Sequence, residues 1–279
     1  MISFPNAKIN LGLNIVSRRE DGYHNLETIF YPIGIKDALE IVPTNEKDVT
    51  GEVPPYRFFQ TGIEIKGEVE NNLVVKALNL VKKEKDIPPI DIHLLKRIPF
   101  GAGLGGGSSN AAEMLKLLNK NFELEYSETE LIALASKLGA DCAFFVKNNP
   151  SLATGIGDIL EEVSVNIDNY HFLLVKPNII VNTAEAYSMI APSKPKLSLK
   201  EIIKMPIEEW REVMINDFEK PIFDIHPSIG KIKQTLYDLG ATYASMSGSG
   251  SSVYAIFEEI PDIGTKFDNY FVWTNKINY

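Results

Sequence analysis

The glycine-rich stretch Pro99–Ala112 constrains the fold of this chain more than any other part of the sequence. It is PFGAGLGGGSSNAA, five glycines followed by two serines. Glycine lets the backbone take positive φ angles and pass close to an anion, and the start of a helix offers unpaired N–H groups to that anion. Because an apolar helical pattern begins where the serines end, the stretch predicts a phosphate-binding loop that leads into a helix.

Neither of two common phosphate-loop patterns identifies the function of this stretch. Gly101, Gly103 and Gly106 satisfy the dinucleotide pattern G-x-G-x-x-G, which matches easily inside a glycine-rich run. Gly101 and Gly106 also begin a P-loop, but Gly107 stands where that motif requires lysine, which argues against a Walker-type NTPase. A slack Gly/Ser linker is disfavoured because an apolar strand pattern precedes the loop and an apolar helical pattern follows it.

Composition limits the class of protein. The chain has 279 residues, 44% of them hydrophobic, enough for one large or two modest domains. Cys142 is the single cysteine and the four histidines have no metal-ligand spacing, so neither a disulfide framework nor a zinc site is expected. The net charge of −9 argues against a nucleic-acid-binding surface. No apolar stretch approaches the roughly 20 residues that span a bilayer, so we expect a cytoplasmic protein with no membrane contact.

Strand and helix patterns mix without a regular βα repeat, which predicts an α+β chain. Asn72 and the S-x-x-E box at Ser127 mark helix starts. Gly155 and Gly157 indicate a hairpin turn near a domain boundary, which divides the chain into residues 1–157 and 158–279. Strands are expected at 1–16, 26–42, 90–97, 171–177 and 253–257, and helices at 72–83, 127–138, 183–190, 207–219 and 228–239.

Three further segments could carry chemistry, and each also has a purely structural interpretation. Lys8, in PNAKINLGL, could be a solvent-facing lysine on an edge strand. Asp141, in GAD, could be a helix N-cap. The segment Ser245–Tyr254, SMSGSGSSVY, could be a surface turn or a second loop that faces an anion.

In combination these segments resemble the GHMP kinases, the family of galactose, homoserine, mevalonate and phosphomevalonate kinases. The resemblance rests on a P-x-A-K-x-N-L-x-L element, the P-x-G-x-G-L-G-x-x-S-S-x-A-A loop, G-A-D-x-x-F-F and a late S-G-S-G loop, in this order. DGYH, GLGGGSSNAA and GADCAFF are most similar to the branch that acts on a cytidine diphosphate-linked methylerythritol in the non-mevalonate isoprenoid pathway. One departure is Ser247, where threonine is frequent in this family.

The resemblance implies a two-domain α+β GHMP kinase fold. The N-terminal domain, residues 1–157, would contain a left-handed βαβ unit around the phosphate loop, and residues 158–279 would form a ferredoxin-like domain. The left hand is implied by the resemblance alone, since such crossovers are right-handed in about 98% of proteins.

The resemblance also implies ATP as the phosphate donor, with Mg²⁺. The backbone of the loop would wrap the triphosphate, and the hydroxyl of Ser108 or Ser109 would lie near the phosphates or the metal. Direct ligands of the metal are not identified. The implied ATP-binding residues are Pro99, Phe100, Gly101, Ala102, Gly103, Leu104, Gly105, Gly106, Gly107, Ser108 and Ser109.

Lys8 and Asp141 match the catalytic pair of the family. Asp141 would accept the proton of the tertiary 2-hydroxyl of the substrate, and Lys8 would stabilise negative charge. The partner implied is this small-molecule polyol, and the protein would be a monomer or a weak homodimer. The implied substrate-binding residues are Asn10, Tyr23, His24, Tyr187, Gly248 and Ser249. In the family, Tyr23 and His24 match positions that contact the cytosine base, and Tyr187 matches an aromatic position that sandwiches it.

Three alternatives remain open at this point. A GHMP kinase of other specificity would keep Lys8 and Asp141 but would not need the aromatic residues. A noncatalytic nucleotide-binding member would have lost the acid or the lysine, and both are present. A dinucleotide-dependent oxidoreductase would need an acidic residue about 20 positions after the glycines; Glu125 has that distance but lies beside a helix cap instead of at the end of a strand.

Overall fold

The computed structural model describes residues 1–47, 51–65 and 67–276, which form two compact units. The first unit comprises residues 1–7, 34–100 and 105–148, and the second comprises residues 8–33, 101–104 and 149–279. These units are defined by spatial contact and interleave along the chain. The sequence boundary after residue 157 therefore stays a prediction.

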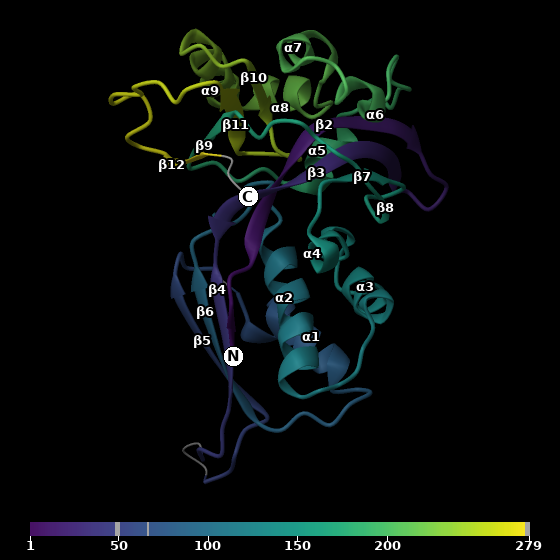
Figure 1. The fold of residues 1–279 in the computed structure, drawn as a ribbon, viewed down its shortest axis with the longest axis vertical. Coiled ribbons are helices and arrows are strands. Elements are labelled where there is room, and N and C mark those ends of the chain that lie inside the picture. Colours follow the sequence, from purple (N-terminus) through teal and green to yellow (C-terminus); the bar gives the residue numbers. More distant parts are fainter. Residues whose placement is uncertain (48–50, 66, 277–279) are drawn as a thin grey trace. The chain divides into compact units, whose positions relative to one another are not determined.

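The first unit contains a four-stranded sheet. Its strands lie in the order β1 (Ile2–Ser3), β4 (Ala38–Pro43), β6 (Ile90–Lys96) and β5 (Tyr56–Gly62), of which β4, β6 and β5 are labelled in Figure 1. β5 and β6 pair in parallel and are joined through the short helix η1 (Val69–Asn71) and helix α1 (Leu73–Val81), so they form a βαβ unit. The left hand of this crossover stays a prediction.

Two helices of the first unit begin directly after a residue whose side chain caps the helix. Asn72 accepts a hydrogen bond from the Val74 N–H at 3.0 Å and starts α1. Ser127 and Glu130 form the expected capping box at α3 (Glu128–Ser136). Helix α2 (Gly106–Asn121) packs on α1, on α3, on the short turn η2 (Ala140–Cys142) and on α4 (Phe144–Lys147). The apolar side of α2, including Ala111 and Leu115, is completely buried, so the helix is firmly held behind the glycine loop.

One sheet of the second unit contains the strand that carries Lys8. Its strands lie in the order β2 (Asn6–Arg18), β3 (His24–Lys36), β7 (Ser151–Thr154) and β8 (Ile159–Glu162). The hairpin turn expected at Gly155 is confirmed: Gly155 has φ +67° between β7 and β8. Gly22, with φ +86°, lies in the turn between β2 and β3. β2 is an edge strand, but residues 7–15 are buried on both faces. Lys8 therefore does not face solvent.

The other sheet of this unit has the order β10 (Tyr243–Met246), β11 (Val253–Phe257), β9 (His171–Lys176) and β12 (Phe271–Lys276), all antiparallel (Figure 1). Since β11 lies between β9 and β10, this is a split βαβ arrangement of the ferredoxin-like kind. Helix α9 (Pro227–Asp238) packs on β10 and β11. The remaining helices of the unit are α5 (Thr183–Ser188), α6 (Leu199–Ile202), η3 (Ile207–Glu209), α7 (Trp210–Val213) and α8 (Glu219–Ile225).

The prediction of one helix over 207–219 is wrong. The chain is helical to Val213, and Met214 then takes extended angles of φ −93° and ψ 100°. The backbone that follows is bonded to β2 instead: the Leu13 N–H donates to the Ile215 carbonyl at 2.9 Å, and the Asp217 N–H donates to the Leu13 carbonyl at 2.8 Å. These long-range bonds replace the bonds that would continue the helix.

Among the described residues, no helix is both long enough and apolar enough to span a membrane.

Candidate active site

The glycine loop joins β6 to α2 through a backbone that needs glycine at three alternate positions. Gly101, Gly103 and Gly105 have φ angles of +61°, +74° and +66°. These angles are strained for residues with a Cβ atom. Gly105 is the N-cap of α2 and offers no side-chain acceptor to the first helical turn. N–H groups at the start of this long helix therefore lack a side-chain cap, which is the arrangement that binds anions.

Gly103 is also fixed by a close contact within the second unit. A Cβ atom added to it would lie 2.0 Å from the Ser247 carbonyl oxygen, which no side chain can occupy. In turn, the Ser247 hydroxyl donates a hydrogen bond to the Gly103 carbonyl at 2.8 Å. The second Gly/Ser segment is thus packed directly on Gly103, and Ser247 is fully buried. It is not a surface turn.

The ammonium of Lys8 lies at this contact. Lys8 is 3% exposed, and its Nζ donates to Asn10 Oδ1 at 2.7 Å and to the Gly103 carbonyl at 3.1 Å. It also lies 4.9 Å from the centre of the Phe30 ring. A buried ammonium needs such oxygen partners because desolvation of the charge is costly. The result is a fixed cation on the glycine loop.

Asn10 connects this cation to the core of the second unit. Its amide donates to the Thr28 hydroxyl at 2.9 Å, and that hydroxyl donates to the Gly12 carbonyl at 2.6 Å. The Tyr254 hydroxyl donates to the Asn10 carbonyl at 2.8 Å. Gly248 lies close by, since a Cβ atom on it would be 3.3 Å from Asn10 Oδ1. The sequence did not single out Thr28 or Tyr254.

A buried ion pair supports the loop in the first unit. Lys96, the last residue of β6, bonds Asp37, and both are 1–2% exposed. The Asn110 amide donates to Asp37 and accepts from Lys96, both at 2.9 Å. Burial lowers the pKa of Lys96, while the charge of Asp37 opposes this. Asp37 also accepts from the N–H groups of Arg97 and Ile98, so the chain is fixed just before it enters the loop.

Asp141 is the middle residue of the turn η2, which packs on α2 within the first unit. It is half-buried and is not an N-cap, since Gly139 takes that position. Its neighbour Cys142 is fully buried and hydrogen-bonds to Ser108 in the first turn of α2. Burial raises the pKa of the Cys142 thiol to about 11; the bond to Ser108 opposes this rise and the charge of Asp141 adds to it. The turn is therefore tied to the phosphate end of α2.

Two of the aromatic residues expected at a base form a pair. The rings of His24 and Tyr187 are stacked, with centroids 5.2 Å apart and planes at 19°. Tyr187 and Phe218 form a T-shaped pair, with ring centroids 4.9 Å apart. Since 5.2 Å is an ordinary distance for rings in direct contact, a base cannot lie between His24 and Tyr187 in this arrangement. Tyr23 is 63% exposed.

The structure places the remaining predicted residues as follows. Ser249 is half-buried, and its hydroxyl lies 3.0 Å from that of Thr183 at the start of α5. Lys8, Asn10, Gly103 and Gly248 come together within the second unit. Ser108 lies beside the turn of Asp141 within the first unit, whereas the Ser109 side chain is only 1% exposed.

The described residues do not supply a ready-made metal cage. In the part of the chain that the structure describes, no three His, Cys, Asp or Glu side chains come together in a cluster that could hold a metal ion.

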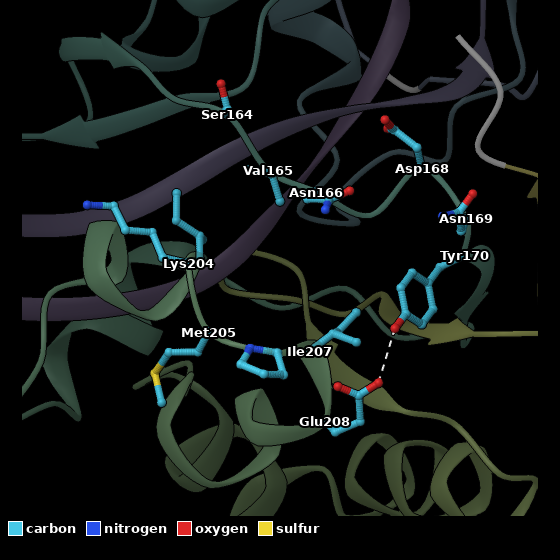
Figure 2. A pocket seen from close by; sticks show the side chains of 12 residues that line it. Ser164, Val165, Asn166, Asp168, Asn169, Tyr170, Lys204, Met205, Ile207 and Glu208 are labelled. Atoms are coloured by element: carbon cyan, nitrogen blue, oxygen red, sulfur yellow. Dashed lines mark hydrogen bonds between the residues drawn. The ribbon is translucent and has the colours of Figure 1, made fainter.

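A hollow of about 760 Å³ lies elsewhere in the second unit (Figure 2). It is lined by residues 164–166, 168–170 and 203–208, and the Tyr170 hydroxyl donates across it to Glu208 at 3.1 Å. None of the site residues predicted from sequence lines it, so we do not assign the active site to this hollow.

Comparisons with known proteins show the family of this chain. The family model described as "GHMP kinases N terminal domain" matches residues 72–149, and "GHMP kinases C terminal" matches residues 198–271. The chain is 53% identical to the 4-diphosphocytidyl-2-C-methyl-D-erythritol kinase of Parabacteroides distasonis, over 100% of both chains. It is 55% identical to the enzyme of the same name from Bacteroides thetaiotaomicron, over 92% of both. A crystal structure of 4-(cytidine 5'-diphospho)-2C-methyl-D-erythritol kinase is similar with a TM-score of 0.79 and 29% identity, over 98% of both chains.

Proposed function

The chain belongs to the GHMP kinase family and is a small-molecule kinase, and we propose that it transfers the γ-phosphoryl group of ATP to 4-diphosphocytidyl-2-C-methyl-D-erythritol. The acceptor is the tertiary 2-hydroxyl of this polyol. Two relatives that are 53% and 55% identical to this chain, over 100% and 92% of its length, carry the name 4-diphosphocytidyl-2-C-methyl-D-erythritol kinase. That agreement supports the substrate, and the roles of individual residues are argued below.

The observation that carries the proposal is the position of Lys8. The glycine loop lacks the lysine by which a P-loop contacts the β- and γ-phosphates. Lys8 brings a buried ammonium to the same loop from β2, bonded to the Gly103 carbonyl and to Asn10. Phosphoryl transfer depends mainly on positioning and on neutralisation of the phosphate charge. Lys8 therefore supplies the charge that the loop itself lacks.

Asp141 is the proposed general base. It lies in a turn that packs on α2 and is bonded, through Cys142, to Ser108. An ionised carboxylate in this place can accept the proton of the substrate hydroxyl while the oxygen attacks phosphorus.

The loop Pro99–Ser109 is the proposed site of the ATP triphosphate, held by N–H groups at the start of α2. Mg²⁺ would be bound by the phosphates, with the Ser108 hydroxyl as a neighbour, because the Ser109 side chain is buried. The metal would neutralise phosphate charge. The protein's own contribution is to fix the backbone donors and to hold Lys8.

The cytidine end of the acceptor is assigned to Tyr23, His24 and Tyr187, and the diphosphate to Gly248 and Ser249, with Asn10 near the hydroxyl. Because His24 and Tyr187 are stacked on each other, the base would stack on an outer face of this pair or would separate the two rings. A kinase for homoserine or mevalonate has no base to bind and would not need these rings.

An ADP-release assay with a panel of acceptors tests the function. Purified protein is mixed with ATP, Mg²⁺ and one of three acceptors: 4-diphosphocytidyl-2-C-methyl-D-erythritol, mevalonate or homoserine. We expect turnover with the first alone. A Tyr187→Ala variant should raise KM for this acceptor and leave KM for ATP unchanged. Turnover of mevalonate or homoserine alone would refute the proposed substrate.

A further inference from the structure

The segment Ile215–Glu219, between α7 and α8, lies along β2 like a short extra strand. Leu13 and Asn216 form an isolated parallel bridge. The Leu13 N–H and carbonyl bond the backbone of Ile215 and Asp217 at 2.9 and 2.8 Å, and the Ile15 N–H donates to Asp217 Oδ2 at 2.6 Å. The segment is thus fixed to the strand that carries Lys8 and Asn10.

The side chain of Asn216 points the other way, to the second Gly/Ser segment. Its Nδ2 donates to the carbonyls of Met246 and Gly248, both at 2.8 Å. Its Oδ1 accepts from the Phe218 N–H at 3.0 Å, and the residue is 3% exposed. Both amide hydrogens are therefore used to hold two carbonyls of one loop.

Glu219 holds the same loop from its other side. Its Oε1 accepts from the Met246 N–H at 2.8 Å and from the Ser245 hydroxyl at 3.2 Å. Its Oε2 is paired with Lys233 at 2.6 Å, which fixes the carboxylate. Met246 is consequently held at its N–H by Glu219 and at its carbonyl by Asn216.

The second Gly/Ser segment, held in this way, contacts the same two groups that accept hydrogen bonds from Lys8. Ser247 bonds the Gly103 carbonyl, which also accepts from Lys8. Gly248 lies against Asn10 Oδ1. Asn216 therefore connects two parts of the second unit: its backbone pairs with β2, the strand of Lys8, and its side chain binds the loop that contains Gly248.

We propose that Asn216 is a positioning residue, which sets the Gly248–Ser249 backbone in register with Lys8 and Asn10 for the phosphate acceptor. This inference rests on the proposed function, since it assigns the acceptor's diphosphate to that backbone. Asn216 acts through the loop and does not itself touch substrate. An aspartate of the same shape would lose the donors and place a charged oxygen against two carbonyls, which is more costly than an empty space.

The test compares Asn216→Ala and Asn216→Asp with Asn119→Ala. Asn119 is a matched control, because its amide also clamps main chain, bonding the carbonyl and the N–H of Tyr126 at 2.9 Å, but at the far end of α2 from the glycine loop. The readouts are amide hydrogen exchange by peptide, KM for acceptor and for ATP, kcat and the melting temperature.

We expect faster exchange in peptides that cover residues 246–252 for both Asn216 variants, and tenfold or greater rises in KM for the acceptor, with KM for ATP changed less than about threefold. Asn119→Ala should lower the melting temperature without either effect. Unchanged exchange at 246–252, exchange raised evenly over the chain, or an unchanged KM for the acceptor would overturn the inference. If the wild type does not turn over the acceptor, the proposed function fails, and the exchange data still decide whether Asn216 holds the loop.

Discussion

Replacement of Lys8 and replacement of Asp141 should both lower kcat, but they should differ in their effect on stability. Lys8→Met keeps an unbranched side chain of similar length but removes the ammonium that donates to the Gly103 carbonyl. We therefore expect kcat to fall by about 10²–10³, as for the loss of one donor that stabilises a transition state. Asp141→Asn removes the proposed base and should lower kcat by about 10²–10⁴. Steady-state kinetics measure both.

The two variants should separate further in stability and in binding. Lys8→Met leaves buried oxygens without a donor and should lower the melting temperature, whereas Asp141→Asn should leave the melting temperature and KM for ATP almost unchanged. Asp158→Asn, at the exposed hairpin between β7 and β8, is the control and should retain wild-type kcat. A near-normal kcat for Asp141→Asn would remove this residue from the mechanism.

Cys142 gives a test that does not depend on substrate. Burial raises the pKa of its thiol from 9.0 to about 11, which lowers the thiolate fraction at pH 8 by about 100-fold, and the thiolate is the reactive form. Alkylation by iodoacetamide at pH 8 should therefore be slow in the native protein and fast in urea. Because the folded state then binds the additional proton, this group should also reduce stability as pH rises from 9 to 11. Native labelling as fast as that in urea would contradict the burial of the turn.

At the level of helices, strands and loops, two glycines of the same loop should respond in opposite ways to one added methyl group. Gly103→Ala meets the Ser247 carbonyl at 2.0 Å and has φ +74°, so it should cost at least the 1–2 kcal/mol of a left-handed residue and should displace the second Gly/Ser segment. Gly107→Ala lies in α2, and its Cβ would make an ordinary contact of 3.6 Å with Leu73. Urea denaturation measures both variants.

The Gly107 variant is the control for this comparison, since alanine is favoured over glycine within helices by about 1 kcal/mol. It should be as stable as the wild type or slightly more stable. Equal destabilisation by the two substitutions would show that the contact between Gly103 and Ser247 does not exist in solution.

The elements that sequence predicts here are those set by near neighbours. The cap at Asn72, the box at Ser127 and the positive φ angles of the glycine loop depend on residues a few positions apart. The Asp37–Lys96 pair joins residues 59 positions apart, and the bond between Ile15 and Asp217 spans 202. The periodicity of apolar residues contains no information on such long-range contacts. The helix expected over 207–219 was wrong for this reason, because the bonds to β2 that end it come from a distant part of the sequence.

For the chain as a whole, sequence order and spatial units differ. Residues 8–33 and 101–104 belong to the second unit although they are surrounded in sequence by the first. Neither half of a chain cut after residue 157 holds all of the second unit. Motif order was enough to recognise the family, because the resemblance depends on which residues occur, while the interleaving depends on contacts that only the folded chain shows.

Product identification tests the central claim most directly. Wild-type protein is incubated with ATP, Mg²⁺ and 4-diphosphocytidyl-2-C-methyl-D-erythritol, and the purified product is examined by ³¹P and ¹³C NMR. We predict one new phosphate monoester, coupled to the quaternary carbon that carried the 2-hydroxyl, in equal amount to the ADP formed. A phosphate on a primary or secondary hydroxyl, or ADP release without a phosphorylated polyol, would contradict the account.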